Sequence, residues 1–519
     1  MRYIALRWFA GVRTICAVLA MTAAAGADGR AVAATQPRYG GTLVVELHAP
    51  ALVLDPVKWK AGTPESAASE QIASAVFDRL VTLDQFGRFQ PGLATDWSHD
   101  EGWRRWQFSL RTGVQFSDGS ALTAAEVAAA LQELFAERLS EKGVVTAAAG
   151  TRVILQFSSP MPDLLEQLAS GRNFIFRRGA DGTLLGTGPF FVAEFTPAAG
   201  NVTTARYKLL PNEKCWAGRP FVDELDVHLG VPALRQLFDL QLGKADVVEL
   251  SADLVRRAQQ ENLRVWASAP VLLYGLQVSG ETGGAPRGST GKADLREALS
   301  LALDRATMAN VLLQRQAEPA ASFLPQWLSG YAFVFGAENN VERAKEIGKK
   351  LLGAPGTGAM PQPLKLRVDA GGDLAKLIGE RVAINARQAG ISVQLQPRAV
   401  ARESASSAPA NSSKAGETPA LRLIAWRYAS LSQRTELAAI SASLQPETGD
   451  ETSTADAEQV YARERRLLTE RGLIPLVVMP EYIGLSAGVR DWMAERWGEW
   501  HLADVWLDGK KSVAEGAQP

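Results

Sequence analysis

The sequence contains few cysteines and no excess of charge of either sign. Its 519 residues include two cysteines, Cys16 and Cys215, and 55 Lys and Arg side chains stand against 56 Asp and Glu. A chain with this balance lacks the net basic surface that general nucleic-acid binding needs. Cys16 falls in an N-terminal stretch that we expect to be removed, so Cys215 would have no partner for an internal disulfide. We therefore expect Cys215 to be a buried, unreactive thiol.

Long apolar runs are absent beyond the N-terminus. Three arginines within the first 13 residues precede an apolar stretch, 15–27, that is too short to span a bilayer. The tripeptide Ala31-Val32-Ala33 then matches an A-x-A cleavage site. We interpret residues 1–33 as a cleaved signal peptide that directs export to the periplasm, with an uncleaved membrane anchor as the alternative. At 46% apolar and 21% charged residues, the remainder has the composition of a folded protein of several domains.

Constellations for catalysis or metal binding are also scarce. The four histidines do not pair at metal-ligand spacing, and no P-loop or C-x-x-C motif occurs. Gly484–Gly488 matches G-x-S-x-G around Ser486, but the segment that follows is too short to supply the rest of a hydrolase core. The sequence thus predicts no metal, no cofactor and no enzymatic activity. An exported serine hydrolase that uses Ser486 is retained as a minor alternative.

Hydrophobic periodicity predicts a mixed α/β chain. Trp106, Phe108 and Leu110 alternate as in a half-buried strand, and Thr123 with Glu126 forms a capping box that opens a helix. Further strands are expected at 42–47, 151–157, 223–229, 364–368, 391–396, 421–426 and 473–479. Further helices are expected from Pro64 onward and at 232–242, 293–304, 341–352, 373–389 and 456–470.

One segment interrupts this order. Residues 402–419 are rich in Ser, Ala and Pro and contain almost no large apolar side chain. Such a segment cannot bury enough apolar surface to offset the entropy lost on ordering. We expect it to form a mobile surface insert.

Short blocks from residue 39 to residue 305 occur in a fixed order. They are Tyr39–Val45 with Leu54–Pro56, Val76–Asp84, Pro91–Trp97, Trp106–Gly119 with Leu122–Val127, Gly186–Phe190, Pro211–Trp216 with Asp223 and Glu224, Gly243–Asp246, and Asp294–Arg305. The Trp106–Gly119 block is the most specific. Together the blocks resemble the family 5 extracellular solute-binding proteins of ABC importers, which include dipeptide-, oligopeptide- and nickel-binding proteins.

The resemblance implies an architecture. It is an α/β, two-lobed periplasmic-binding-protein type II fold with an extra subdomain in the first lobe. The first lobe would comprise residues 34–56, 186–268 and a return segment 475–519, with the extra subdomain at 57–185; the second lobe would comprise 269–474, including the mobile insert 402–419. We expect the chain to be a monomer.

The resemblance also implies a function. The protein would capture a peptide-like or other small polar ligand between its lobes and deliver it to the permease and ATPase subunits of an ABC importer. Binding would shift an equilibrium between open and closed forms, because the ligand contacts both lobes only when they close. The alternative is a degenerate binding protein that signals or escorts a partner.

The segment after the strand at 421–426 departs from the family pattern. Peptide-binding relatives usually carry an Asp there that holds the peptide's ammonium group, whereas this chain reads Trp426-Arg427-Tyr428-Ala429. Arginine suits carboxylates because its planar fork bonds both oxygens. We therefore hypothesise a ligand with an anionic or neutral polar end, bound by Arg427 with Tyr274, Trp426 and Tyr428 as walls. The alternative role for Arg427 is an ion pair within the protein.

Overall fold

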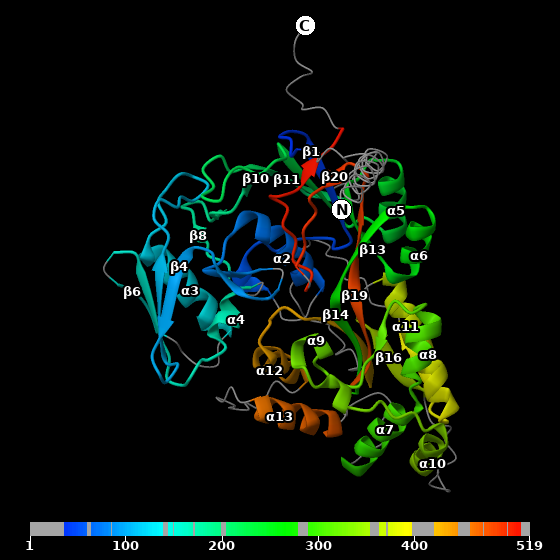
Figure 1. The fold of residues 1–519 in the computed structure, drawn as a ribbon. Helices are drawn as coiled ribbons and strands as arrows, with labels where there is room; N and C mark the ends of the chain where they lie inside the picture. Colours follow the sequence, from blue (N-terminus) through cyan, green and yellow to red (C-terminus); the bar gives the residue numbers. More distant parts are fainter. Residues whose placement is uncertain are drawn as a thin grey trace, which may run out of the picture. The chain divides into compact units, whose positions relative to one another are not determined.

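The computed structural model describes the chain from residue 36 to residue 509, with gaps (Figure 1). The gaps are residues 60–63, 85, 139–143, 149, 170–171, 199–203, 279–288, 353–362, 370–371, 397–419, 445–456, 471 and 496. The predicted signal peptide 1–33 and the predicted insert 402–419 both lie outside the described residues. Within the described part, no helix has the length and apolar composition needed to cross a membrane.

One large mixed sheet is built from strands that lie between Thr42 and Leu485. Its strand order is β10-β11-β12-β1-β13-β19-β14-β18-β16-β17, and β15 pairs with β19 off this path. The strands are β10 Phe190–Thr196, β11 Ala205–Pro211, β12 Glu224–Leu229, β1 Thr42–Leu47, β13 Val247–Leu250, β19 Leu473–Leu485, β14 Arg264–Val278, β18 Leu421–Arg427, β16 Leu364–Val368, β17 Val393–Gln396 and β15 Glu318–Pro319. The pairs β1–β12, β1–β13, β16–β17 and β16–β18 are parallel. The others along this path are antiparallel.

The two longest strands, β14 and β19, pair with each other in the middle of this sheet (Figure 1). Their antiparallel register slips at Ala267/Pro270, Pro270/Leu272 and Tyr274/Gly275. Such bulges bend a strand and increase its twist. Through these two strands, the sheet formed around β1 continues without a break into the sheet formed around β16 and β18.

Helices cover the large sheet and the segment that follows β1. They are α2 Pro64–Val76, α3 Ala124–Arg138, α4 Leu164–Ala169, α5 Ala233–Gln241, α6 Ala252–Gln260, α7 Ser289–Ala302, α8 Arg305–Thr307, α9 Gln326–Ser329, α10 Val341–Leu352, α11 Gly372–Gln388, α12 Gln433–Leu444 and α13 Ala457–Glu470. Short one-turn segments lie at Pro56–Lys58, Met308–Leu312 and Ala332–Val334. The predicted helix 341–352 and the predicted strand 364–368 coincide with α10 and β16.

The extra segment after β1 builds a small sheet of its own. Its strands are β4 Ala94–His99, β5 Arg105–Leu110, β7 Arg152–Gln156 and β6 Val144–Ala148, in the order β4-β5-β7-β6. The alternation predicted in β5 is confirmed, since Trp106, Phe108 and Leu110 are buried while the residues between them are partly exposed. The predicted cap is also present, because the Thr123 hydroxyl accepts the Glu126 N–H at 3.2 Å. Short hairpins join β2 Val81–Leu83 to β3 Phe89–Pro91 and β8 Arg177–Arg178 to β9 Leu184–Leu185. Outside this segment, β20 Val489–Arg490 pairs antiparallel with β21 Trp506–Leu507 near the C-terminal end of the described residues.

Among the described residues, buried apolar side chains form three clusters. The first joins β1, α2 and the extra segment with the C-terminal residues after β19. The second lies between the central strands and helices α5, α6, α7, α10 and α11. The third is smaller and packs Trp426 and Tyr428 against α12 and α13. Cys215 is buried as expected, and burial raises its thiol pKa to about 11, which leaves little thiolate at neutral pH.

Glu46 on β1 forms a buried carboxyl pair with Asp239 of α5, beside His228 of β12. Burial raises the pKa of Glu46 to about 7, and the charge of Asp239 adds to the rise. A raised pKa means that the protonated carboxyl stabilises the fold. This contribution to stability is fully present below pH 4.5, the pKa of the carboxyl in the unfolded chain. It is lost as the pH rises through about 7, the pKa in the folded protein.

We expect Glu46→Gln to be more stable than the wild type at pH 8, by about 1–3 kcal/mol, because glutamine cannot ionise. At pH 5 the two proteins should differ little, since Glu46 is then protonated in the folded wild type. Urea unfolding at both pH values measures this. The same stability difference at pH 5 and pH 8 would contradict a titrating Glu46.

Candidate functional site

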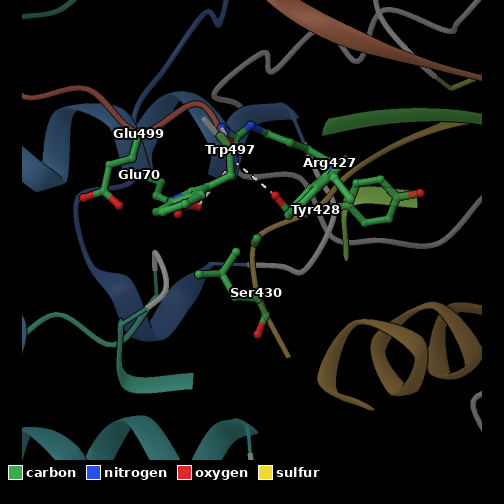
Figure 2. A pocket seen from close by; sticks show the side chains of 9 residues that line it. Glu70, Arg427, Tyr428, Ser430, Trp497 and Glu499 are labelled. Carbon is green, nitrogen blue, oxygen red and sulfur yellow. Dashed lines mark hydrogen bonds and ion pairs between the residues drawn. The ribbon is translucent and has the colours of Figure 1, made fainter. Parts of the chain in front are cut away.

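A pocket lies where four separate parts of the chain meet (Figure 2). Helix α2 supplies one lining residue, helix α9 supplies another, the end of β18 with the residues after it supplies five, and the segment after β20 supplies two. The lining residues are Glu70, Trp327, Arg427, Tyr428, Ala429, Ser430, Leu431, Trp497 and Glu499. Its cavity volume of about 10 Å³ is roughly what one water molecule requires, so a larger molecule could enter only if the walls separated.

Arg427 ends β18 and is 5% exposed. Its Nε and Nη2 donate to the two carboxylate oxygens of Glu481 on β19, at 2.7 and 3.0 Å. The Nη1 nitrogen donates to the Tyr428 carbonyl at 3.3 Å and lies 4.0 Å from the Glu70 carboxylate. The fork that would suit a ligand carboxylate is therefore bound to Glu481, and Nη1 is the nitrogen directed toward Glu70.

The charged side chains around the pocket change one another's pKa values. Burial by itself would lower the pKa of the Arg427 guanidinium, but Glu481 and Glu70 raise it above its ordinary value. Burial raises the pKa of Glu70, while Arg427 and Arg79 act in the opposite direction. Glu499 is paired with Arg79 at 2.6 Å. Arg427 therefore stays charged, and both carboxylates that line the pocket have an arginine within 4.0 Å.

A glycine lets the C-terminal segment approach the Arg427–Glu481 pair. Gly498 has a φ of +101°, and a Cβ there would lie 2.9 Å from both Arg427 Nη2 and Glu481 Oε2. Any other residue would be strained and would collide with the ion pair. Gln71 of α2 holds the same segment, since its side chain bonds to the Gly498 carbonyl and accepts the Trp500 N–H at 3.1 Å. These contacts fix Trp497 and Glu499 beside the pocket.

The opposite wall is held by two buried glutamates. Glu436 of α12 accepts the Ala429 N–H at 2.8 Å and the Trp426 Nε1–H at 3.1 Å. Glu464 of α13 accepts the backbone N–H groups of residues 323 and 324, at 2.7 and 2.9 Å, and the Tyr331 hydroxyl at 2.8 Å. Burial raises the pKa of both glutamates. They order the loops that carry the pocket residues 429–431 and Trp327.

The four residues singled out from the sequence occupy different positions. Arg427 and Tyr428 line the pocket, and the Tyr428 hydroxyl donates to the Phe323 carbonyl. Trp426 belongs with Tyr428 to the third core cluster but does not line the pocket, and its Nε1–H donates to Glu436. Tyr274 is 5% exposed and belongs to the second core cluster. The structure thus brings Arg427 and Tyr428 together at the pocket and places Tyr274 and Trp426 in the packing around it.

Sequence reasoning singled out only Arg427 and Tyr428 of the nine lining residues, and the seven that it missed include Glu70, Trp327, Trp497 and Glu499. Trp497 and Glu499 follow the last predicted strand in an irregular stretch where no periodicity marks them. Glu70 and Gln71 are consecutive polar residues in the buried part of α2, between Ser69 and Ile72. Buried polar residues need hydrogen-bonding partners. Two polar residues beside the apolar positions of this helix were therefore the only indication in the sequence that the helix contributes to a polar site.

Ser486 of the G-x-S-x-G match follows β19. Its hydroxyl donates to Asp246 Oδ1 at 2.9 Å, and the other oxygen of Asp246 accepts the Val44 N–H at 3.1 Å. The Ser486 N–H donates to the Asp246 carbonyl at 2.8 Å. These bonds tie the end of β19 to β1 and β13, which is a structural role.

Comparisons with known proteins agree with this geometry. The sequence is 24% identical over 350 residues to the periplasmic murein peptide-binding protein MppA of Escherichia coli (strain K12), across 60% of this chain and 62% of that protein. It is 24% identical over 355 residues to the nickel-binding periplasmic protein of the same organism, across 62% of this chain and 66% of that protein. The alignments thus span slightly less than two thirds of these curated relatives.

The likeness in fold covers more of the chain. The solved structure of the Escherichia coli murein tripeptide binding protein MppA superposes with a TM-score of 0.71 at 18% identity, over 91% of this chain and 99% of that one. The predicted fold class is confirmed, since the structural neighbours are two-lobed periplasmic binding proteins. The model of the bacterial extracellular solute-binding proteins, family 5 (middle region), matches residues 88–431, which is more than half of the chain. The chain therefore belongs to the family 5 bacterial extracellular solute-binding proteins.

Proposed function

We propose that this protein is a periplasmic substrate-binding protein of an ABC importer, which binds a peptide-like or other small polar ligand and passes it to a membrane permease. The observation that carries the proposal is the pocket, because its walls come from α2, α9, the end of β18 and the segment 497–499. Because this cavity holds about one water molecule, the walls would separate to admit a ligand, which would then contact segments far apart in the chain. The murein peptide-binding relative supports a peptide-like ligand.

The division into lobes is part of the proposal. The first lobe would comprise 34–56, 186–268 and 475–519, with the subdomain 57–185, and the second lobe would comprise 269–474. Under this division Glu70, Trp497 and Glu499 belong to the first side of the pocket, and Trp327 and residues 427–431 belong to the second. The irregular register of β14 around Ala267 and Pro270, near the 268/269 boundary, supports a hinge there.

The ligand's polar groups would meet both signs of charge. Arg427 offers Nη1, whereas its other two donors are bound to Glu481. An anionic ligand end would share Arg427 with Glu481, while a cationic end would lie near Glu70 and Glu499. Tyr428, Trp327 and Trp497 supply apolar surface, with Trp426 and Tyr274 packed behind the wall. We therefore propose a polar ligand of peptide size that carries its own hydrogen-bonding groups.

Two other functions are weighed against this one. A degenerate binding protein with a signalling or escort role would keep the fold and lack a transporter. The genes next to the one that encodes this protein would discriminate between the two. Genes for a permease and an ATPase would favour import, whereas a gene for a sensor kinase would favour signalling. The bonds of Ser486 to Asp246 speak against the hydrolase, because they engage the hydroxyl in the scaffold.

We expect Trp497→Ala to weaken binding of the best ligand about tenfold or more, because large aromatic side chains at the centre of a site dominate affinity. The ligand is first identified by native mass spectrometry of the purified protein. Calorimetry with free, N-blocked and C-blocked peptides then measures affinity in the wild type and the variant. Trp327→Ala, from the other side of the pocket, should show a comparable loss.

The matched control is Trp103→Ala. Trp103 is 36% exposed and stacks on His99 in the extra subdomain, outside the pocket. It should leave affinity unchanged, and thermal unfolding checks that each variant is folded. Unchanged affinity in both pocket variants, with both folded, would place the ligand elsewhere.

A further inference from the structure

Asp163 makes a dense set of contacts between two segments more than 260 residues apart. Its Oδ1 accepts from Arg434 Nη2 at 2.6 Å, and its Oδ2 accepts from Arg434 Nε at 3.4 Å and from the Ser432 hydroxyl. Gln167 of α4 donates to the same Oδ2 at 3.1 Å. The side chains of Asp163 and Arg434 are each 15% exposed. A carboxylate with this many donors is strongly anchored, because charge-assisted hydrogen bonds are about twice as strong as neutral ones.

The partners of Asp163 sit at the beginning of α12. Ser432 precedes this helix, and its hydroxyl accepts the Thr435 N–H at 3.1 Å while it donates to Asp163. Asp163 therefore faces the N-terminal end of a twelve-residue helix, where a negative charge is favourable. Arg434 Nη2 also contacts the Met161 sulfur at 3.3 Å. The loop 161–163 thus contacts the first turn of α12 and holds it in place.

This contact adjoins the pocket directly. Leu431 lines the pocket, and Ser432 is the next residue. The wall 427–431 is consequently held at both ends: Arg427 bonds to Glu481 at one end, and Ser432 bonds to Asp163 at the other. Only the second anchor comes from the subdomain 57–185. A change at Asp163 would free one end of the wall without touching the pocket residues themselves.

We propose that Asp163 is a positioning residue that latches the extra subdomain to the start of α12 and thereby sets how far the pocket closes. The proposal rests on the proposed function, since a latch matters only if the two sides separate. Loss of the carboxylate removes every bond between Asp163 and α12. We expect this loss to raise the ratio of open to closed molecules by about tenfold, the effect of 1.4 kcal/mol.

The test measures a distance between the two sides in the complete mature protein. Spin labels are attached at Glu101→Cys and Ala462→Cys, two exposed positions on the extra subdomain and on α13, in a Cys215→Ala background. Pulsed electron resonance then gives the distribution of distances. Asp163→Ala should add a population at a changed distance. The exchange of charges in Asp163→Arg with Arg434→Asp should reduce that population toward the wild-type level.

The matched control is Asp84→Ala. Asp84 also accepts several hydrogen bonds, from Phe86, Arg88 and Gln90, but all these partners lie within its own hairpin. The distance distribution of the labelled Asp84→Ala variant should equal that of the labelled wild type. If Asp163→Ala does not fold, Asp163→Asn is used, which loses the charge and one of the two acceptor oxygens, so that a smaller added population is expected. Equal distributions in the wild type and the folded Asp163 variant would overturn the latch, whereas the importer function is judged separately by the calorimetry.

Discussion

Replacement of Glu481 by alanine is expected to lower the free energy of unfolding by about 3–5 kcal/mol, because it leaves the Arg427 guanidinium buried without its partner. Arg427 is 5% exposed, and two of its nitrogens bond to Glu481. Among the described residues, Glu70 also lies within 4.0 Å of Arg427, but it makes no hydrogen bond to it at that distance. Urea unfolding followed by circular dichroism measures the loss.

A double variant tests the cause of this loss. In Arg427→Met with Glu481→Leu no charge is left unpaired at the pair itself, so we expect the double variant to be more stable than Glu481→Ala alone. Glu261→Ala is the surface control, since its pair with Arg257 is exposed and should contribute less than about 1 kcal/mol. A double variant less stable than Glu481→Ala would show that the shape of the pair, and not its charge, holds the wall.

Glu464→Ala should have the next largest effect, a loss of about 3–5 kcal/mol, because two buried backbone donors and one half-buried hydroxyl lose their acceptor at once. Glu464 is fully buried, and its oxygens accept from the N–H groups of Phe323 and Leu324 and from the Tyr331 hydroxyl. The same loop carries Trp327 into the pocket. Ligand affinity should therefore fall together with stability.

The isosteric variant Glu464→Gln separates geometry from charge. Its amide oxygen can still accept both backbone N–H groups, and its NH₂ can donate to the Tyr331 oxygen. Because burial raises the pKa of Glu464, the native side chain is less charged than an ordinary glutamate. We expect Glu464→Gln to cost less than half of what Glu464→Ala costs. Equal losses in thermal unfolding would contradict an acceptor role.

Secondary structure was predictable where periodicity was strong. The helix 341–352 and the strand 364–368 were located to the residue, because amphipathic spacing and a β-rich apolar run specify them locally. The strand predicted at 473–479 extends to Leu485, and the 15-residue strand β14 was not predicted at all. Pro270 and the register slips of β14 interrupt the alternation by which a strand is detected. Pairing with β19 stabilises that backbone despite the weak local pattern.

The pocket was predictable only in part. Arg427 and Tyr428 attracted attention because they stand where the family pattern carries an acid. Glu70 joins them from a helix 357 positions earlier in the numbering, and its role depends on the path of the chain between. The bidentate bond to Glu481 could not be inferred either, since no local spacing relates β18 to β19.

The sequence by itself determined the family, the mixed α/β elements and the balanced charge, because these depend on residue types and on patterns that extend over a few turns. Only the tertiary structure decided which charges face the pocket, that the Arg427 fork is bound to Glu481, and that Asp163 reaches the start of α12. The physical reason is that ion pairs and buried hydrogen bonds form between side chains brought within about 3 Å by folding, and separation along the chain carries no information about that approach.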